Sequence, residues 1–265
     1  MNEESKRPTL LLTGATGSIG KVLTPHLQKS YDLILVDKDL SDLESELRET
    51  SQLIEVDLSD PKNCKGILDE VDYMVHLAGD PRADAEFYDS LFDANFKVTY
   101  NLFREASQSE RVKRILFASS IHAVGGYPLD TQVNTDMYPR PADLYGVSKA
   151  YMEVLASYYA YGSLKEFIGI RIGGFEGLEG DTETLENMMK YLSPDDMCHL
   201  VDRCLEAELK RPFLLVNGVS DNTFKRLDIT QAREDIDYYP KDNAFEMYNV
   251  FTETKDNITN DKKKK

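Results

Sequence analysis

Short apolar runs alternate along the chain with longer segments whose apolar residues recur at helical spacing. Runs typical of strands lie at Thr9–Thr13, Tyr31–Val36, Gln52–Val56, Tyr73–Leu77, Arg114–Ala118, Phe167–Ile172 and Pro212–Asn217. Helical spacing follows the first run over Ser18–Lys29 and recurs over Phe87–Ala106, Asp143–Tyr159 and Ser193–Glu208. Strands that alternate with helices are typical of parallel βαβ units, so the pattern predicts an α/β protein with a doubly wound parallel sheet.

Several of these strands carry no polar alternation. Residues 10–12 are three leucines in a row, and residues 33–36 are all aliphatic. A strand that is covered on both faces needs an apolar side chain at every position, whereas a strand with one wet face alternates. The pattern therefore predicts helices on both faces of the sheet.

The pattern loosens after about Gly173. Ser193 still begins a clear helix, because it can cap the first turn, Pro194 fits the first helical position, and two aspartates follow. We expect one domain over residues 1–265, with a sheet core over about 8–172 and a small C-terminal region over about 173–251. The polar tail, 252–265, ends in four lysines. We interpret it as a frayed or added end rather than a nucleic-acid arm.

Composition excludes some classes of function. The chain has 47 acidic and 31 basic residues and a formal net charge of -16, with no basic stripe, so we expect no nucleic-acid partner. No apolar run approaches the roughly 20 residues that cross a bilayer, and the first eight residues are polar, so we expect neither a membrane segment nor a secretory signal. Cys64, Cys198 and Cys204 fit free thiols in a reducing cytoplasm. We therefore expect a cytoplasmic protein without a metal site.

A glycine-rich turn joins the first strand to the first helix. The glycines stand at positions 14, 17 and 20. The first permits a tight turn, the second lets the backbone approach a pyrophosphate, and the third lets the helix pack close to the sheet. Unpaired amides at the positive end of the helix then bind the anion. The turn therefore predicts a dinucleotide site formed by Gly14, Thr16, Gly17, Ser18, Ile19 and Gly20.

An acidic residue ends the second strand, about 20 residues further on, as this motif requires. The Asp37 carboxylate can accept hydrogen bonds from a ribose and repel a 2′-phosphate, which predicts NAD rather than NADP as the cofactor. Lys38 follows directly and can soften that discrimination, so use of NADP stays open.

We interpret His76 as a packed core histidine. The remaining cofactor contacts that we predict are at strand ends: Asp57, Leu58, Leu77, Ala78, Gly79 and Ile172.

Two further segments carry residues suited to proton transfer. Tyr145 and Lys149 are four apart on a predicted helix and therefore share one face. A tyrosine pKa of about 10 makes a poor base at neutral pH, but a neighbouring ammonium and a cationic nicotinamide lower that pKa. Tyr145 can then take a proton from a substrate hydroxyl as hydride leaves the carbon. We expect Ser120, at the carboxyl end of a strand, to orient the same substrate oxygen.

Together these motifs resemble the extended short-chain dehydrogenases/reductases of the NAD-dependent epimerase/dehydratase superfamily, and within it the uronate dehydrogenases most. The resemblance runs from Thr9 to about Tyr248 and is carried by residues 117–128, 140–149, 171–173, 192–196 and 239–244. It implies a Rossmann-type core that binds NAD and a small C-terminal substrate-binding region. A homo-oligomer is also implied, because helices corresponding to 87–106 and 143–159 often pair between subunits in this superfamily.

The resemblance also assigns roles to single residues. It implies that Ser120, Tyr145 and Lys149 are catalytic, and that Asn95 supports the lysine through the backbone and water. Tyr145, Lys149 and Asn95 would also lie beside the cofactor. The substrate contacts that it implies are Ser120, Ile121, His122, Tyr145 and Gly174.

Three positions depart from the uronate dehydrogenase pattern. Ile121 stands where those enzymes usually carry asparagine, and Gly174 stands where they carry serine. Their carboxylate-binding arginine aligns near Glu186 or Asn187, and a carboxylate there repels a uronate. The nearest cations for an acidic substrate group are Lys190 and Arg171, of which the second also fits a structural role.

We therefore predict a dehydrogenase that oxidises a sugar or sugar acid, at C1 to give a lactone, with NAD as the hydride acceptor. A nucleotide-sugar epimerase is the first alternative, although epimerases carry a longer C-terminal lobe. A dehydratase is disfavoured, because Ile121 and His122 replace the acidic pair of those enzymes. A non-enzymatic redox sensor that binds dinucleotide is the third possibility. Such proteins typically lose the tyrosine or the lysine, and this chain keeps both.

Overall fold

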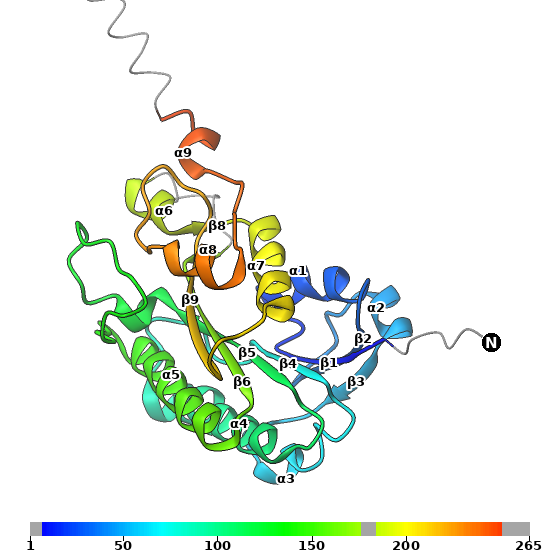
Figure 1. Cartoon of the computed structure of the whole chain (residues 1–265). Coiled ribbons are helices and arrows are strands. Elements are labelled where there is room, and N and C mark those ends of the chain that lie inside the picture. Colours follow the sequence, from blue (N-terminus) through cyan, green and yellow to red (C-terminus); the bar gives the residue numbers. More distant parts are fainter. Residues whose placement is uncertain (1–6, 176–183, 251–265) are drawn as a thin grey trace, which may run out of the picture.

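A seven-stranded parallel sheet forms the centre of the protein (Figure 1). The structure is a computed structural model that describes residues 7–175 and 184–250. The strand order is β3-β2-β1-β4-β5-β6-β9, which confirms the predicted doubly wound sheet. The strands are β1 (Thr9–Thr13), β2 (Asp32–Asp37), β3 (Gln52–Glu55), β4 (Tyr73–His76), β5 (Arg114–Ser120), β6 (Glu166–Ile172) and β9 (Phe213–Gly218).

Helices cover both faces of this sheet (Figure 1). On one face α4 (Val98–Gln108) and α5 (Leu144–Ser163) lie side by side, and on the other α1 (Ser18–Leu27) contacts α7 (Pro194–Glu206). The shorter elements are α2 (Ser45–Thr50), α3 (Pro61–Cys64), the 3₁₀ turn η2 (Ile121–Val124), α6 (Leu185–Lys190), α8 (Thr230–Ile236) and α9 (Ala244–Met247).

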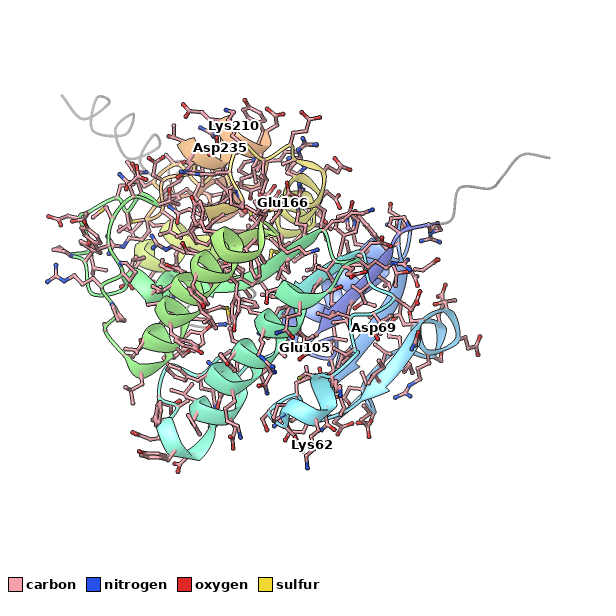
Figure 2. All side chains as sticks on the ribbon, turned by 60° about the horizontal axis from the view of Figure 1, so that its bottom comes forward. Lys62, Asp69, Glu105, Glu166, Lys210 and Asp235 are labelled. Atoms are coloured by element: carbon pink, nitrogen blue, oxygen red, sulfur yellow. The ribbon has the colours of Figure 1, made fainter. Side chains whose placement is uncertain are left out.

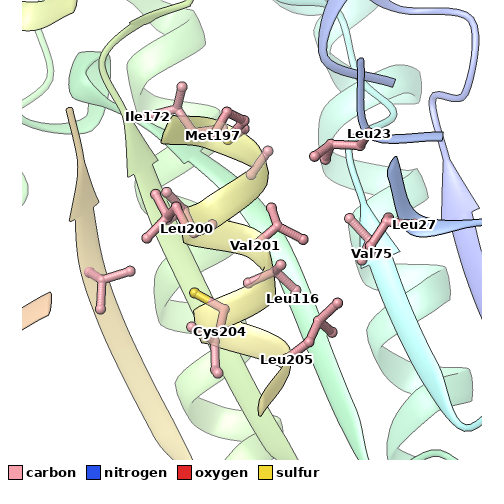
Figure 3. Packing of buried hydrophobic residues seen from close by; sticks show 14 of the residues in the cluster. Leu23, Leu27, Val75, Leu116, Ile172, Met197, Leu200, Val201, Cys204 and Leu205 are labelled. Atoms are coloured by element: carbon pink, nitrogen blue, oxygen red, sulfur yellow. The ribbon is translucent and has the colours of Figure 1, made fainter. Parts of the chain in front are cut away.

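Alternate residues of the central strands enter two separate cores. Leu10 and Leu12 pack on the side of α1 and α7, whereas Leu11 packs with α4 and α5. Figure 3 shows the first core, where Leu200 and Val201 of α7 lie over the sheet. Burying one such aliphatic side chain contributes roughly 1.5–3 kcal/mol. Because each face has its own helices, the three central positions of β1 are all apolar.

The strand order reverses at β1 and β4. β2 and β3 lie on one side of this pair, and β5, β6 and β9 lie on the other. Loops from the carboxyl ends of β1 and β4 therefore diverge and leave a crevice between them, which is where open parallel sheets bind ligands. The parallel register brings the ends of β1, β2, β4 and β5 to the same edge.

The helix predicted over residues 87–106 is present, but its first half is not wound as an α-helix. Residues Phe87–Lys97 form a π-helix, η1, in which the Leu91 amide donates to the Glu86 carbonyl five residues back. The chain becomes α-helical from Val98 to Gln108. Apolar spacing did not separate the two windings, because both place residues four apart near one another, as the buried pair Leu91 and Asn95 shows.

Beyond Gly173 the structure contains elements that the sequence pattern did not predict. A two-stranded parallel sheet joins β7 (Gly174–Phe175) to β8 (Tyr191–Leu192), and α6 lies between them in the chain. Each of these elements is too short to show a hydrophobic period. The predicted polar tail, 252–265, lies outside the described residues.

Most charged side chains lie at the surface, as Lys62, Asp69 and Lys210 do in Figure 2. Glu153 of α5 and Arg171 of β6 are a buried exception, with side chains 5% and 1% exposed. Two N–H groups of the guanidinium donate to the two carboxylate oxygens, each at 2.9 Å.

Within the described ranges, no helix is long and apolar enough to cross a bilayer.

Removing one partner of this buried pair should destabilise the fold. In a Glu153→Gln variant the Arg171 guanidinium stays buried without a counter-charge, and we expect the free energy of unfolding to fall by about 3 kcal/mol. Urea unfolding monitored by circular dichroism measures the change. An Asp93→Asn variant is the control, because Asp93 pairs with Lys97 at the surface and exposed pairs contribute little. Equal effects of the two substitutions would contradict a structural role for the buried pair.

Candidate active site

A cleft of about 710 Å³ runs along the carboxyl edge of the sheet. It starts at the glycine turn after β1, passes the end of β4, and reaches Ser120 and Tyr145. Sites for small molecules and cofactors usually measure about 300–1,000 Å³. The cleft therefore has room for a ligand that touches both the glycine turn and the residues proposed for proton transfer.

The glycine turn has the geometry of a pyrophosphate cradle. Gly14 adopts a φ of 75°, and a Cβ atom there would lie 2.7 Å from the Ala78 amide nitrogen. A Cβ at Gly20 would lie 2.2 Å from the Gly14 carbonyl oxygen, so α1 packs directly against the turn. Gly17 has only ordinary contacts and faces the cleft. Among the described residues no side chain caps α1, so its first amides can bind an anion.

Asp37 is fixed at the ribose end of this cradle. Its Oδ2 atom accepts hydrogen bonds from the Thr16 amide at 3.1 Å and the Thr16 hydroxyl at 2.8 Å. Its Oδ1 atom accepts from the Lys38 amide at 2.8 Å. A carboxylate held this way can still accept hydrogen bonds from ribose hydroxyls through its remaining lone pairs. The turn, the helix end and this carboxylate together fit a dinucleotide.

Asn95 is buried and links two elements beside the cleft. Its amide nitrogen donates to the Ser148 hydroxyl at 2.9 Å and to the Asp80 carbonyl at 3.1 Å, while its oxygen accepts from the Asp80 amide at 2.7 Å. Asn95 thereby ties the loop after β4 to α5, one residue before Lys149. Its role towards the lysine stays a prediction, since these direct contacts go to Asp80 and Ser148.

Lys149 is buried between α5 and β5. Its ammonium donates to the Ala118 carbonyl at 2.8 Å and lies 5.4 Å from the centroid of the Tyr145 ring. Burial lowers the pKa of this lysine to about 8. His76 lies nearby as a buried core histidine, as predicted, with Nδ1 2.8 Å from the Thr13 hydroxyl.

Tyr145 lies at the wall of the cleft with only 9% of its surface exposed. Burial raises the pKa of its phenol, the charges of Asp143 and Asp80 raise it further, and a hydrogen bond with Ser120 lowers it. The cationic nicotinamide on which the predicted lowering depends is not among these groups, so that lowering stays a prediction.

Ser120 and His122 complete the substrate end. The Ser120 hydroxyl oxygen accepts from the His122 amide at 3.1 Å, which leaves its O–H group to donate towards Tyr145. The His122 imidazole Nδ1 lies 2.7 Å from one Asp143 carboxylate oxygen. The other oxygen accepts from the Gly146 amide at 2.6 Å and caps α5. One carboxylate thus fixes the histidine ring and the start of the helix that carries Tyr145.

Most of the predicted site residues meet in this cleft. Those that line it are Gly14, Thr16, Gly17, Ser18, Ile19, Gly20, Asp37, Leu58, Leu77, Ala78, Gly79, Ser120, His122, Tyr145, Lys149, Ile172 and Gly174. Three predicted contacts are not part of its lining: Asn95, Asp57, whose carboxylate pairs with Lys38 at 3.2 Å, and Ile121, which packs against the core. Their contacts with ligands stay predictions.

The sequence analysis missed other lining residues. Asp80, Pro81 and Gly173 directly follow predicted contacts, so extending each strand end by one or two residues would have found them. Ser90 and Ala94 come from η1, where no motif marks them. The further lining residues are Val56, Val98, Ala118, Ser119 and Phe175.

The two cations suggested for an acidic substrate group are both paired. Arg171 is buried against Glu153 and is therefore structural, and Lys190 forms an ion pair with Glu186 at 3.2 Å. The charged side chains of the described lining near Tyr145 are those of Asp80 and Lys149. Asp80 is itself paired with Arg82 at 2.7 Å. The cleft therefore places the Asp80 carboxylate at the same end as Tyr145 and Ser120.

Comparisons with known proteins agree with this geometry. The NAD dependent epimerase/dehydratase family matches residues 10–195. Over 90% of its length the chain is 34% identical to an NAD-dependent glucose-6-phosphate dehydrogenase from Haloferax volcanii, of which 95% is covered. It is 33% identical to a uronate dehydrogenase from Pseudomonas putida, with 89% of this chain and 84% of that protein covered.

A solved structure supports the same assignment. A mutant uronate dehydrogenase from Agrobacterium tumefaciens in complex with NAD superposes with a TM-score of 0.81 at 28% identity, covering 94% of this chain and 90% of that one. The predicted similarity to uronate dehydrogenases and the predicted cofactor, NAD, are thereby confirmed. The chain belongs to the NAD dependent epimerase/dehydratase family, as an NAD-dependent enzyme of the extended short-chain dehydrogenase type.

Proposed function

We propose that this protein oxidises a sugar or sugar acid at a hydroxyl-bearing carbon, at C1 to give a lactone. The observation that carries the proposal is the meeting of Tyr145, Ser120 and Lys149 in the same cleft as the glycine turn. The dehydrogenases named above, which act on glucose 6-phosphate and on uronates, support a sugar as the substrate class.

Each of the three side chains has a distinct task in this reaction. Ser120 and Tyr145 bind the substrate hydroxyl, and Tyr145 removes its proton. NAD, when bound, supplies the carbon that accepts the hydride. Lys149 favours the phenolate, because a cation next to a buried anion offsets part of its desolvation cost. The Ala118 carbonyl holds that cation at a fixed place below the tyrosine ring.

An epimerase remains the weaker alternative. Solved UDP-glucuronic acid 4-epimerase from Bacillus cereus shares 18% identity with the chain, which establishes a common fold and no common reaction. The same tyrosine would serve both reactions, so the two functions differ in whether NADH accumulates. Net NADH production with a free sugar favours the dehydrogenase.

Replacing Tyr145 with phenylalanine should abolish turnover without abolishing cofactor binding. We expect kcat to fall at least about 100-fold, because general acid–base catalysis contributes about 10²–10⁴-fold. The assay follows NADH absorbance across uronates, sugar phosphates and neutral aldoses. Tyr138→Phe, a change at an exposed position outside α5 and outside the described lining of the cleft, is the control and should retain full activity. A fully active Tyr145→Phe enzyme would refute the proposed role.

His122 is the second residue that we propose to contact the sugar. If its Nδ1–H group donates to Asp143, the Nε2 atom is left to accept a hydrogen bond from a sugar hydroxyl. His122 lines the cleft, and its ring lies 5.3 Å from the Tyr145 ring. Asp143 would then act as a positioning residue that fixes the histidine tautomer.

An Asp143→Asn variant tests this arrangement. Asparagine can still cap α5 through its side-chain oxygen, but it removes the charge that favours the Nδ1–H tautomer. We expect KM for the sugar to rise about tenfold with the unfolding temperature nearly unchanged, since a hydrogen bond to a charged group contributes about 1.5–3 kcal/mol. Asp143→Ala, which also removes the cap, should lower that temperature. An Asn variant with unchanged KM would argue against the positioning role.

We also propose that a second copy of the chain covers the outer face of α5. Val147, Val154, Tyr158 and Tyr161 are 42%, 66%, 70% and 58% exposed. Their spacing places them on one face of the helix. An exposed apolar stripe of this kind usually marks an interface.

Light scattering after size exclusion can test the oligomeric state. We expect the wild type to elute as an oligomer and Tyr158→Lys to shift the population towards monomer, because an ammonium would be buried without a partner. Leu129→Lys, at an exposed position away from α5, is the matched control and should not change the mass. A monomeric wild type at high concentration would exclude this interface.

A further inference from the structure

Lys38 and Asp57 form an ion pair at the adenosine end of the cleft. The Lys38 ammonium lies 3.2 Å from Asp57 Oδ2, and the Asp57 Oδ1 atom accepts from the Ser59 amide at 2.8 Å. Lys38 lines the cleft, as do Val56 and Leu58, whereas Asp57 is not part of the described lining. The lysine side chain is therefore drawn towards a carboxylate outside the wall of the cleft.

The side chains around Lys38 carry mostly negative charge. Three carboxylates, those of Asp37, Asp39 and Asp57, stand close to Lys38 in the chain or in space. Hydrogen bonds from Ser41 hold the pKa of Asp39 below its usual value. For Asp57 burial acts to raise the pKa, but hydrogen bonds from Ser59 and Lys38 leave it lowered. At neutral pH both side chains are anionic, so one ammonium faces several negative charges.

We propose that Asp57 holds Lys38 away from the ribose site, so that this pair excludes a 2′-phosphate in addition to Asp37. A free lysine next to the ribose would serve as a point-charge ligand for that phosphate. The paired lysine still has free N–H groups, but the Asp57 carboxylate offsets its charge and holds the ammonium at a distance of 3.2 Å. The sequence suggested that Lys38 softens the preference for NAD, and the ion pair argues for the opposite effect. The proposal rests on NAD as the cofactor of this enzyme.

Asp37 adds to the exclusion of a 2′-phosphate by the pair of Lys38 and Asp57, because hydrogen bonds hold its carboxylate in place. Thr16 holds one of its oxygens through two hydrogen bonds, and the Lys38 backbone amide holds the other. A 2′-phosphate would therefore meet a fixed carboxylate on one side and an occupied lysine on the other. Lys38 and Asp57 are about half exposed, at 54% and 50%, so the contribution of their pairing is modest.

The test measures cofactor binding without any sugar. Dissociation constants of NADH and NADPH come from the fluorescence of each cofactor on titration with wild type, Asp57→Asn, Lys38→Ala and the double variant. We expect Asp57→Asn to lower the ratio of the NADPH to the NADH constant about fivefold, the upper end for an exposed pair. Lys38→Ala introduced into the wild type should change that ratio less than twofold. Introduced into Asp57→Asn, the same substitution should reverse most of the fall in the ratio.

Asp42→Asn is the matched control. Asp42 pairs with Lys21 at 3.9 Å on the surface, and the substitution changes the net charge by the same amount as Asp57→Asn. Neither Asp42 nor Lys21 belongs to the described lining of the cleft. The control should leave the ratio of the two constants unchanged, which separates the local pair from the overall charge.

Two results would overturn the proposal. One is an unchanged ratio in Asp57→Asn with circular dichroism of a folded protein. The other is an equal loss of NADPH affinity on Lys38→Ala in both backgrounds, which would mean that the lysine already serves the phosphate. If wild type binds NADH and the ratio shifts as expected while no sugar is oxidised, this proposal stands and the proposed reaction fails.

Discussion

The Lys149 ammonium is nearly buried, at 5% residue exposure, and is held by the Ala118 carbonyl 2.8 Å away. Burying a charge costs several kcal/mol unless it is well partnered, so the surrounding structure must keep α5 and β5 in register. One turn further along α5, Glu153 bonds to Ser119 at 2.5 Å and to Arg171. One residue before the lysine, Ser148 accepts from Asn95. Polar contacts on both sides therefore fix the helix that carries Tyr145 and Lys149, the residues proposed to be catalytic.

Burial acts on the tyrosine and the lysine in opposite senses. It raises the pKa of the Tyr145 phenol and lowers that of Lys149 to about 8, so each group is pushed towards its neutral form. In the proposed reaction Tyr145 has to be a phenolate before it can take a proton from the substrate, so nearby cations are needed to stabilise that anion in this buried place. The carboxylates of Asp80 and Asp143 work against that anion, but each has a cationic or polar partner, Arg82 or His122.

Local patterns in the sequence were enough to predict the sheet and most of the cleft. A strand, a spaced glycine turn and a helix fix the place of Gly14, and parallel strands bring Asp37 and Ser120 to the same edge. The direction of a side chain after a strand depends on the loop, which is why Asp57 turned to Lys38 instead of lining the cleft. The pKa of Tyr145 also depends on burial and on carboxylates such as Asp80 that are distant in sequence, and a local pattern does not predict these contributions.

Whether the site can bind a substrate with a negative charge depends on a few side chains near Tyr145. Arg171 is committed to Glu153, and Lys190 to Glu186, so neither is available to an anionic group without breaking a pair. Arg82 lies beside the cleft wall with its side chain 63% exposed, but it already binds Asp80. A sugar acid or sugar phosphate bound there has to compete with the Asp80 carboxylate for Arg82, whereas the hydroxyls of a neutral aldose can donate hydrogen bonds to that carboxylate. At this end of the cleft the pair of Asp80 and Arg82 therefore acts together with the Lys149 ammonium in deciding whether an anionic group can bind.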